Sequence, residues 1–449
     1  MRILVTALLI LGLLMPLAAS PAAKIFPYKY FTDDLPNGLR VITIPTDYPN
    51  IVALFIVVGT GSRNEVEPGK SGFAHLFEHL MFRGTEKFPT AKYEEIMKKA
   101  GADSNAYTTD DRTVYHTTFS KEDLDQIMML EADRFQNLKV PVDLFKTETK
   151  AVLGEYNKNA SNPIRKMYEV LRDTAYQTHT YKHTTMGFLR DIENFPNMYE
   201  YSLEFFKRYY RPEYTTITVV GDVRHDNVLQ LVSKYWSNWQ RGSYVPQIRN
   251  EPEQTRELSA NVDWPLQTLP LVMVSYKGPP YSDEQKDLAA LDLIAALGFS
   301  PNSELYQRLV IKEQKVDALF SDFEDHRDPY LLTVGARVKD AKDVDYVKNE
   351  IIKTFNSFKS TAVQKDKLDA AQSNLRYSFA LGLDNSEAIA AALAPYIALR
   401  RTPETINKVY DLYAVITPED IQAIARKYFV DTHRTTVTLS HKENAKNAQ

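Results

Sequence analysis

Apolar residues along this chain alternate between runs typical of β-strands and the wider spacing typical of amphipathic helices. Two stretches rich in strand-forming residues lie at Leu39–Val58 and Leu269–Ser275. Each is followed by a helical pattern, at Thr90–Lys99 and Glu284–Leu297 respectively. Strands followed by helices in both halves predict α+β domains.

The two halves also share a segment in which a helix ends in an aromatic turn and continues into a strand rich in Thr and Val. Residues 208–219 are echoed by residues 426–439, about 220 residues later, and each segment is expected to close one copy of the same domain. Residues 246–257 are polar, carry two prolines and lack apolar periodicity, which is typical of a linker. We therefore expect two structurally repeated domains, each an antiparallel sheet with helices packed on it, at 25–245 and 258–440. A flexible tail is expected at 441–449.

The first 22 residues are typical of a secretory signal peptide. A positively charged start precedes an apolar run from Ile3 to Leu17, and small residues suited to cleavage follow. The run is shorter than the roughly 20 residues of a membrane span, and it lacks the Arg-rich amphipathic pattern of a mitochondrial presequence. We expect a bacterial periplasmic location, with secretion or an uncleaved membrane anchor as alternatives.

The composition excludes some classes of protein and restricts others. The chain has no cysteine, so a disulfide framework and a lipid-modified cysteine are excluded, and stability must come from hydrophobic burial. With 54 basic and 58 acidic residues the net charge is −4, which gives no overall basic field and argues against nucleic-acid binding.

The most informative five residues are His75-Leu-Phe-Glu78-His79. On a helix, positions i, i+3 and i+4 fall within about 100° of arc, so these three polar side chains can converge on one point. Two neutral imidazoles suit a zinc ion, and a carboxylate beside them suits the activation of a water molecule. With 9 histidines in 449 residues, the pattern would arise by chance in roughly one chain in a hundred. A helix is supported by apolar residues at helical spacing: Phe73, Leu76, Phe77, Leu80 and Met81.

The order His-x-x-Glu-His inverts the commoner zinc-protease motif, and the whole segment Ser71–Thr85 resembles the signature of the M16 family of inverzincins, which includes pitrilysin, insulysin and mitochondrial processing peptidase. The resemblance, to a bacterial M16B-type enzyme, implies a third zinc ligand on a downstream helix, with another Glu seven residues before it. Glu155 and Glu148 stand at those positions. On the residues alone, either would be an ordinary solvated helix Glu. The resemblance implies that Glu155 binds the zinc ion and that Glu148 contacts the ligands without binding the ion itself.

A further segment, Gly101–Tyr115, also resembles the family, and alternation after Asn105 predicts a strand. In the resembling enzymes the open edge of this strand accepts the substrate backbone as an extra strand. The resemblance therefore implies that Asn105, Ala106 and Tyr107 bind the peptide. The pattern alone leaves open an ordinary strand in the middle of a sheet.

The second half departs from the family. Many active members carry there an Arg and a Tyr that hold the substrate and the developing oxyanion, whereas Val310 and Asp317 stand at the matching positions and cannot donate. Arg308 is a candidate substitute, with an ordinary amphipathic-helix residue as the alternative. We therefore expect a heterodimer with an inactive M16 paralogue that supplies the missing pair, and a homodimer as the alternative. The second half has no counterpart of the zinc motif around residues 287–294. Seven further histidines are not expected to be ligands: His116, His179, His183, His225, His326, His433 and His441.

Together these features imply a zinc-dependent endopeptidase that hydrolyses short or unfolded peptides after export. One Zn²⁺ per chain would be held by His75, His79 and Glu155, with Glu78 as the general base. A narrow-specificity processing peptidase and a non-catalytic peptide-binding or structural subunit are the alternatives, although the retained motif argues against the second.

Overall fold

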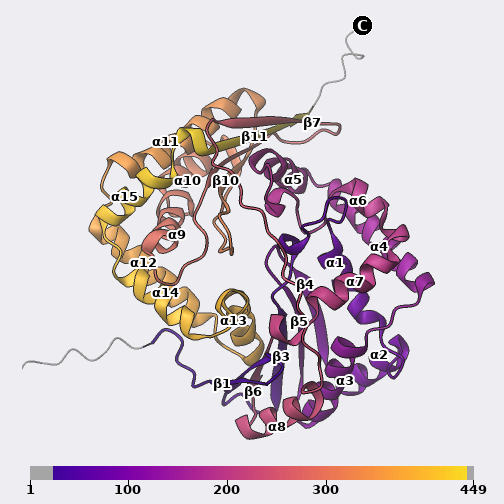
Figure 1. Ribbon diagram of the computed structural model, residues 1–449. Helices are drawn as coiled ribbons and strands as arrows, with labels where there is room; N and C mark the ends of the chain where they lie inside the picture. Colours follow the sequence, from indigo (N-terminus) through magenta and orange to yellow (C-terminus); the bar gives the residue numbers. More distant parts are fainter. Residues whose placement is uncertain (1–23, 442–449) are drawn as a thin grey trace, which may run out of the picture.

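The computed structural model describes residues 24–441. The expected signal peptide therefore lies outside the described residues, as does the expected tail apart from His441. The chain forms two lobes that face each other, each built on one sheet (Figure 1). Within residues 24–441, no helix combines the length and the apolar character needed to cross a lipid bilayer.

The first lobe contains a six-stranded sheet in the order β1-β2-β6-β3-β5-β4. Its strands are β1 (Phe31–Asp34), β2 (Arg40–Pro45), β3 (Ile51–Val58), β4 (Asp103–Thr108), β5 (Thr113–Ser120) and β6 (Thr215–Gly221). Its helices are α1 (Phe73–Leu80), α2 (Thr90–Lys99), α3 (Leu124–Asn137), α4 (Val142–Ala160), α5 (Pro163–Ala175), α6 (Leu189–Glu193), α7 (Tyr199–Tyr209) and α8 (His225–Trp236).

The second lobe contains a five-stranded sheet in the order β7-β11-β8-β10-β9. Its strands are β7 (Leu258–Trp264), β8 (Leu271–Lys277), β9 (Val316–Asp322), β10 (Leu331–Val338) and β11 (Arg434–His441). Its helices are α9 (Lys286–Phe299), α10 (Glu304–Tyr306), the π-helix η7 (Gln307–Lys312), α11 (Val344–Ser360), α12 (Lys365–Leu381), α13 (Ser386–Arg400), α14 (Glu404–Ala414) and α15 (Pro418–Tyr428).

The two sheets repeat one topology. The order β2-β6-β3-β5-β4 in the first matches β7-β11-β8-β10-β9 in the second, strand for strand along the chain. In each sheet one pair is parallel, β2 with β6 and β7 with β11, and the other pairs are antiparallel. The expected α+β fold with two repeated sheets is therefore confirmed, and the parallel pairs are an addition to it.

Each half also sends a helix to the sheet of the other half. Helix α13 packs through Leu393 and Ile397 on apolar residues of β3, such as Phe55, in one buried cluster. Reciprocally, α5 packs through Leu171 on β7 and β11 of the second sheet, where Val437 is fully buried. In Figure 1, α13 lies beside β3, and α5 lies below β7 and β11. Because the first sheet is covered on both faces, β3 is apolar throughout and buried after its first residue, and β6 is buried along its whole length although it contains three threonines.

The segment between the lobes has no helix or strand from residue 239 to residue 257. It is nonetheless fixed to both halves. The carboxylate of Glu251 accepts hydrogen bonds from the backbone N–H groups of Gln177, Thr178 and His179 at 2.7–3.0 Å. Gln254 donates to the Thr432 carbonyl at 2.9 Å. The domain limits at 25–245 and 258–440 stay a prediction.

Candidate metal centre

Helix α1 carries the His-x-x-Glu-His motif and is held in the core by its apolar face. Phe73, Leu76 and Leu80 are almost completely buried, which fixes the opposite face toward α4. The rings of His75 and His79 lie edge to face, 4.9 Å apart. The two imidazoles therefore lie side by side on one face of the helix.

Helix α4 brings a carboxylate to the two imidazoles. Oε2 of Glu155 lies 3.6 Å from Nε2 of His75 and 3.4 Å from Nε2 of His79. All three ligand atoms fall within 4.8 Å of one another, and no other group of three possible ligands does so within residues 24–441. The seven remaining histidines thus form no such group there.

These separations fit a zinc ion. Ligand bonds of about 2.0–2.1 Å in a tetrahedral arrangement place the ligand atoms about 3.3 Å apart. The two observed separations are close to that value and longer than ordinary hydrogen bonds. Burial, followed by the neighbouring His79, lowers the pKa of His75 to about 4, so that imidazole is neutral, the form that binds metal.

Glu148 lies behind this group, between His79 and Arg83. Its Oε2 is 4.0 Å from Nδ1 of His79, and its Oε1 is 2.9 Å from Nε of Arg83. The carboxylate is buried. This placement is compatible with the expected supporting role.

Glu78 lies on the same helix face but outside the group of three. Its Oε2 accepts a hydrogen bond of 2.6 Å from Oγ1 of Thr108, at the end of β4. Burial raises the pKa of Glu78. Thr108 was not singled out from the sequence, although it lies within the family-like segment 101–115.

Within the described part of the chain, strand β4 lies at the edge of its sheet and pairs only with β5. The alternative of a strand in the middle of the sheet is therefore wrong. At the turn between β4 and β5, the Thr109 N–H donates to the Arg112 carbonyl. Hydrogen-bonded pairs recur at every second residue of an antiparallel ladder, so the N–H and C=O groups of Ala106 point away from β5. The Ala106 N–H is instead bound by the side-chain oxygen of Asn105 at 2.8 Å. A backbone donor at an open edge can pair with an added strand.

The candidate residues of the second half lie elsewhere. Arg308, in η7, donates to the Tyr346 hydroxyl at 2.8 Å and pairs with Glu350. Asp317, in β9, pairs with Arg337. Among the described residues, no interaction joins Arg308 to α1 or α4.

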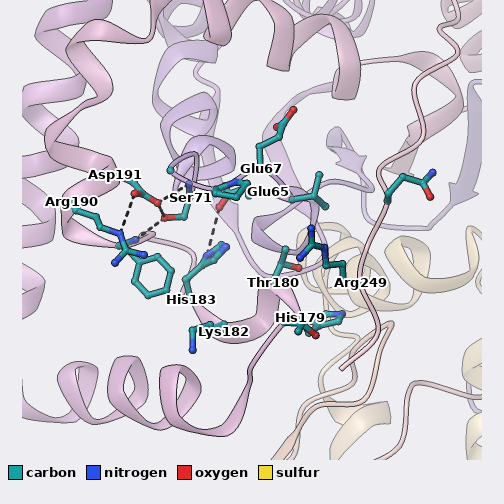
Figure 2. Close-up of a pocket in the computed structure, with 16 residues that line it drawn as sticks. Glu65, Glu67, Ser71, His179, Thr180, Lys182, His183, Arg190, Asp191 and Arg249 are labelled. Carbon is teal, nitrogen blue, oxygen red and sulfur yellow. Dashed lines mark hydrogen bonds and ion pairs between the residues drawn. The ribbon is translucent and has the colours of Figure 1, made fainter. Parts of the chain in front are cut away.

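The N-terminus of α1 is fixed by the carboxylate of Glu65, which precedes the zinc motif by ten residues. Glu65 accepts hydrogen bonds of 2.7 Å from the N–H groups of Gly72 and Ala74. Next to it, the Ser71 hydroxyl donates to Asp191 at 2.5 Å. A cavity of about 230 Å³ opens beside these groups, and Figure 2 shows Glu65, Ser71 and Asp191 on its wall. Burial raises the pKa of Glu65 well above its usual range. No local pattern points to Glu65; its nearness to the motif is the only signal.

Two family models match the chain. Residues 40–188 match the model described as insulinase (peptidase family M16), and residues 198–375 match the model described as the peptidase M16 inactive domain.

Individual proteins match over almost the whole chain. The zinc protease PqqE of Helicobacter pylori is 29% identical over 433 residues, which cover 95% of this chain and 96% of that protein. The probable β subunit of mitochondrial-processing peptidase from Schizosaccharomyces pombe is 24% identical, over 90% of this chain and 89% of its own. The crystal structure of a protease from Helicobacter pylori covers 92% of this chain and 99% of its own, with 28% identity and a TM-score of 0.86.

Proposed function

The chain belongs to peptidase family M16 and is a zinc metalloprotease, and we propose that His75, His79 and Glu155 hold the zinc ion while Glu78 is the general base. The observation that carries this proposal is the convergence of those three ligand atoms within 4.8 Å, with Glu78 on the same helix. A zinc ion at that point supplies a Lewis acid that polarises a carbonyl group and acidifies a water molecule.

Glu78 is suited to move the protons of peptide hydrolysis. Its raised pKa makes its carboxylate a stronger base than an exposed Glu. The hydrogen bond from Thr108 holds one oxygen of the carboxylate, and the other would face the attacking water. Glu78 would take the proton of that water and pass a proton to the leaving amine.

We propose an endopeptidase that binds short or unfolded peptides along β4. The outward N–H of Ala106 is available to a peptide carbonyl once the Asn105 side chain moves aside. Asn105 and Tyr107 flank this position on the same edge strand. Because the contacts with β4 would be made by the backbone of the peptide, peptides of many different sequences could bind there.

We further propose export, directed by residues 1–22, and a heterodimer with an inactive paralogue. Support for the partner comes from Val310 and Asp317, which cannot donate to an oxyanion, and from Arg308, which is already held by Glu350. One relative is itself named a subunit.

The test uses the purified chain without its first 22 residues, with zinc content and hydrolysis of an unbiased peptide library as readouts. Glu78→Gln should keep its zinc while activity falls by about 10²- to 10⁴-fold, the usual contribution of a general base. Near wild-type turnover in that variant would remove Glu78 from the role. The heterodimer would be rejected if the chain alone hydrolyses peptides and an added paralogue does not raise the rate.

A further inference from the structure

A cavity of about 350 Å³ lies at the junction of the two lobes and the linker, away from the residues of the metal centre. Its wall combines elements of both lobes: the end of β3, η1 (Ser62–Asn64), the start of β6, the linker, the β9–β10 loop and the end of α13. Its charged lining residues are Arg63, Glu213, Arg327 and Arg401.

Two of these charges are already compensated. Nε of Arg63 lies 2.5 Å from Oδ2 of Asp328. Glu213 lies 3.5 Å from Nη1 of Arg211, which is outside the cavity lining. Among the residues that the structure describes, the lining charges with no oppositely charged group within ion-pair distance are therefore Arg327 and Arg401.

Within residues 24–441, the hydrogen bonds of these two guanidinium groups go to uncharged oxygen atoms. Arg327 donates to the Ala398 carbonyl at the end of α13. Arg401 donates to the carbonyls of Glu213 and Thr215 at 3.2 and 2.9 Å, among others. Neither forms an ion pair with a carboxylate anywhere in the described chain, and Nε of Arg327 is buried without a hydrogen-bond partner. Burial lowers the pKa of both residues, helped by nearby guanidinium groups and opposed by carboxylates that lie beyond ion-pair distance, chiefly Asp111 for Arg327 and Asp34 for Arg401. A half-buried charge that no carboxylate contacts directly is costly.

The backbone at Arg401 supports a specific role for its side chain. Arg401 is the residue that directly follows α13, and its φ of 56° is left-handed. Helices commonly have glycine at this position. An arginine there carries a conformational cost that glycine would avoid. The position is thus occupied by a cation where backbone conformation alone favours glycine.

We propose that this cavity binds a small tetrahedral oxyanion, of the size of phosphate or sulfate, between Arg327 and Arg401. Guanidinium groups present planar forks of N–H donors that match such oxygens. The bound anion would supply the missing counter-charge. It would also join the β9–β10 loop and the end of α13 to the wall contributed by the first lobe, and so stabilise the arrangement of the lobes.

Binding of inorganic phosphate is measured by titration calorimetry on the full chain at constant ionic strength set with chloride. The expected result is one phosphate per chain and a melting temperature that rises with phosphate concentration, as mass action requires. The titration is repeated after removal of zinc, because an anion at the metal centre would be lost with the metal whereas this one would remain.

Two substitutions test the location. Arg327→Met should weaken phosphate binding at least tenfold. Val245→Glu should do the same without removing a native polar contact, because Val245 lines the cavity, is 64% exposed and would bring a competing carboxylate. Val245→Gln and Arg249→Met are the matched controls and should bind like the wild type.

Three results would each overturn the proposal. They are the absence of saturable phosphate binding to the wild type, binding that disappears with zinc, and equal affinity in Val245→Glu and Val245→Gln.

Discussion

The carboxylate of Glu65 accepts the backbone N–H of Ala74 at 2.7 Å, inside the first turn of the helix that carries both histidines of the motif. The same carboxylate accepts the N–H of Gly72. Glu65 therefore fixes the position of α1 from outside the motif.

Replacing Glu65 should weaken zinc binding without touching a ligand. Glu65→Ala leaves two buried N–H groups unpaired, which should cost about 1–3 kcal/mol each and allow α1 to shift. We expect at least tenfold weaker zinc affinity in a chelator competition, with partial recovery in Glu65→Gln, which keeps one acceptor oxygen. Glu67→Gln is the control, because Glu67 contacts Tyr201 and Arg208 instead of α1. Unchanged zinc affinity in Glu65→Ala would show that α1 does not depend on this contact.

Thr108 should affect the rate of the reaction more than binding. Thr108→Val removes the hydrogen bond that orients Glu78, worth about 1–1.5 kcal/mol, so kcat should fall about tenfold. Zinc content and KM should change little. Thr108→Ser keeps the hydroxyl and should recover most of the rate. Equal kcat values for the valine and serine variants would contradict the orienting role.

The sequence allowed the motif face to be predicted because the spacing of His75, Glu78 and His79 is local to one helix. Glu155 lies on a different helix, so only the family resemblance could single it out. Glu65 and Thr108 reach the site through contacts between distant segments that leave no periodic trace, and both were missed.

The fold shows the same division between local and long-range information. Helix α2 was predicted at Thr90–Lys99 and has those limits, since apolar spacing within a segment fixes a helix. The exchange of α5 and α13 between the two sheets was not predicted. The spacing of apolar residues shows that a helix has an apolar face, but it does not indicate which sheet that face covers.

The exchanged helix α13 should make the two lobes unfold together. Leu393 is fully buried against the first sheet, so Leu393→Ala should destabilise the protein by about 2–5 kcal/mol. Urea unfolding followed by far-UV circular dichroism should remain a single transition at a lower midpoint. Leu381→Ala, at a 78% exposed position in α12, is the control and should change stability little. A separate early transition of one lobe in the Leu393 variant would contradict the coupling.

Asp328 should make the free energy of unfolding depend on pH in the acid range. Burial opposes its ionisation, but hydrogen bonds from His179 and Arg63 outweigh burial and hold its pKa well below the ordinary value of 3.8. A depressed folded-state pKa adds stability that is present above about pH 4 and is lost as the pH falls below that value. Asp328→Asn should therefore be less stable than the wild type at pH 7, with a difference that shrinks below pH 4. The free energy of unfolding in urea, measured for both proteins across this range, checks the sign. A difference that stays constant with pH would rule out the ionised pair as its source.

Proline at position 106 should separate peptide binding from the stability of the sheet. Proline removes the N–H of Ala106, which faces away from β5, so the ladder between β4 and β5 loses no hydrogen bond. A peptide added along the open edge would lose one backbone bond of about 1 kcal/mol, which corresponds to a several-fold rise in KM. Zinc content should be unchanged, and the melting temperature should fall far less than in Tyr107→Pro, where the N–H faces β5. Ala106→Ser is the control, because it keeps the backbone donor. If Ala106→Pro and Ala106→Ser hydrolyse peptides with the same KM, the substrate does not pair with β4 at this position, and the peptide must be held by groups other than this edge.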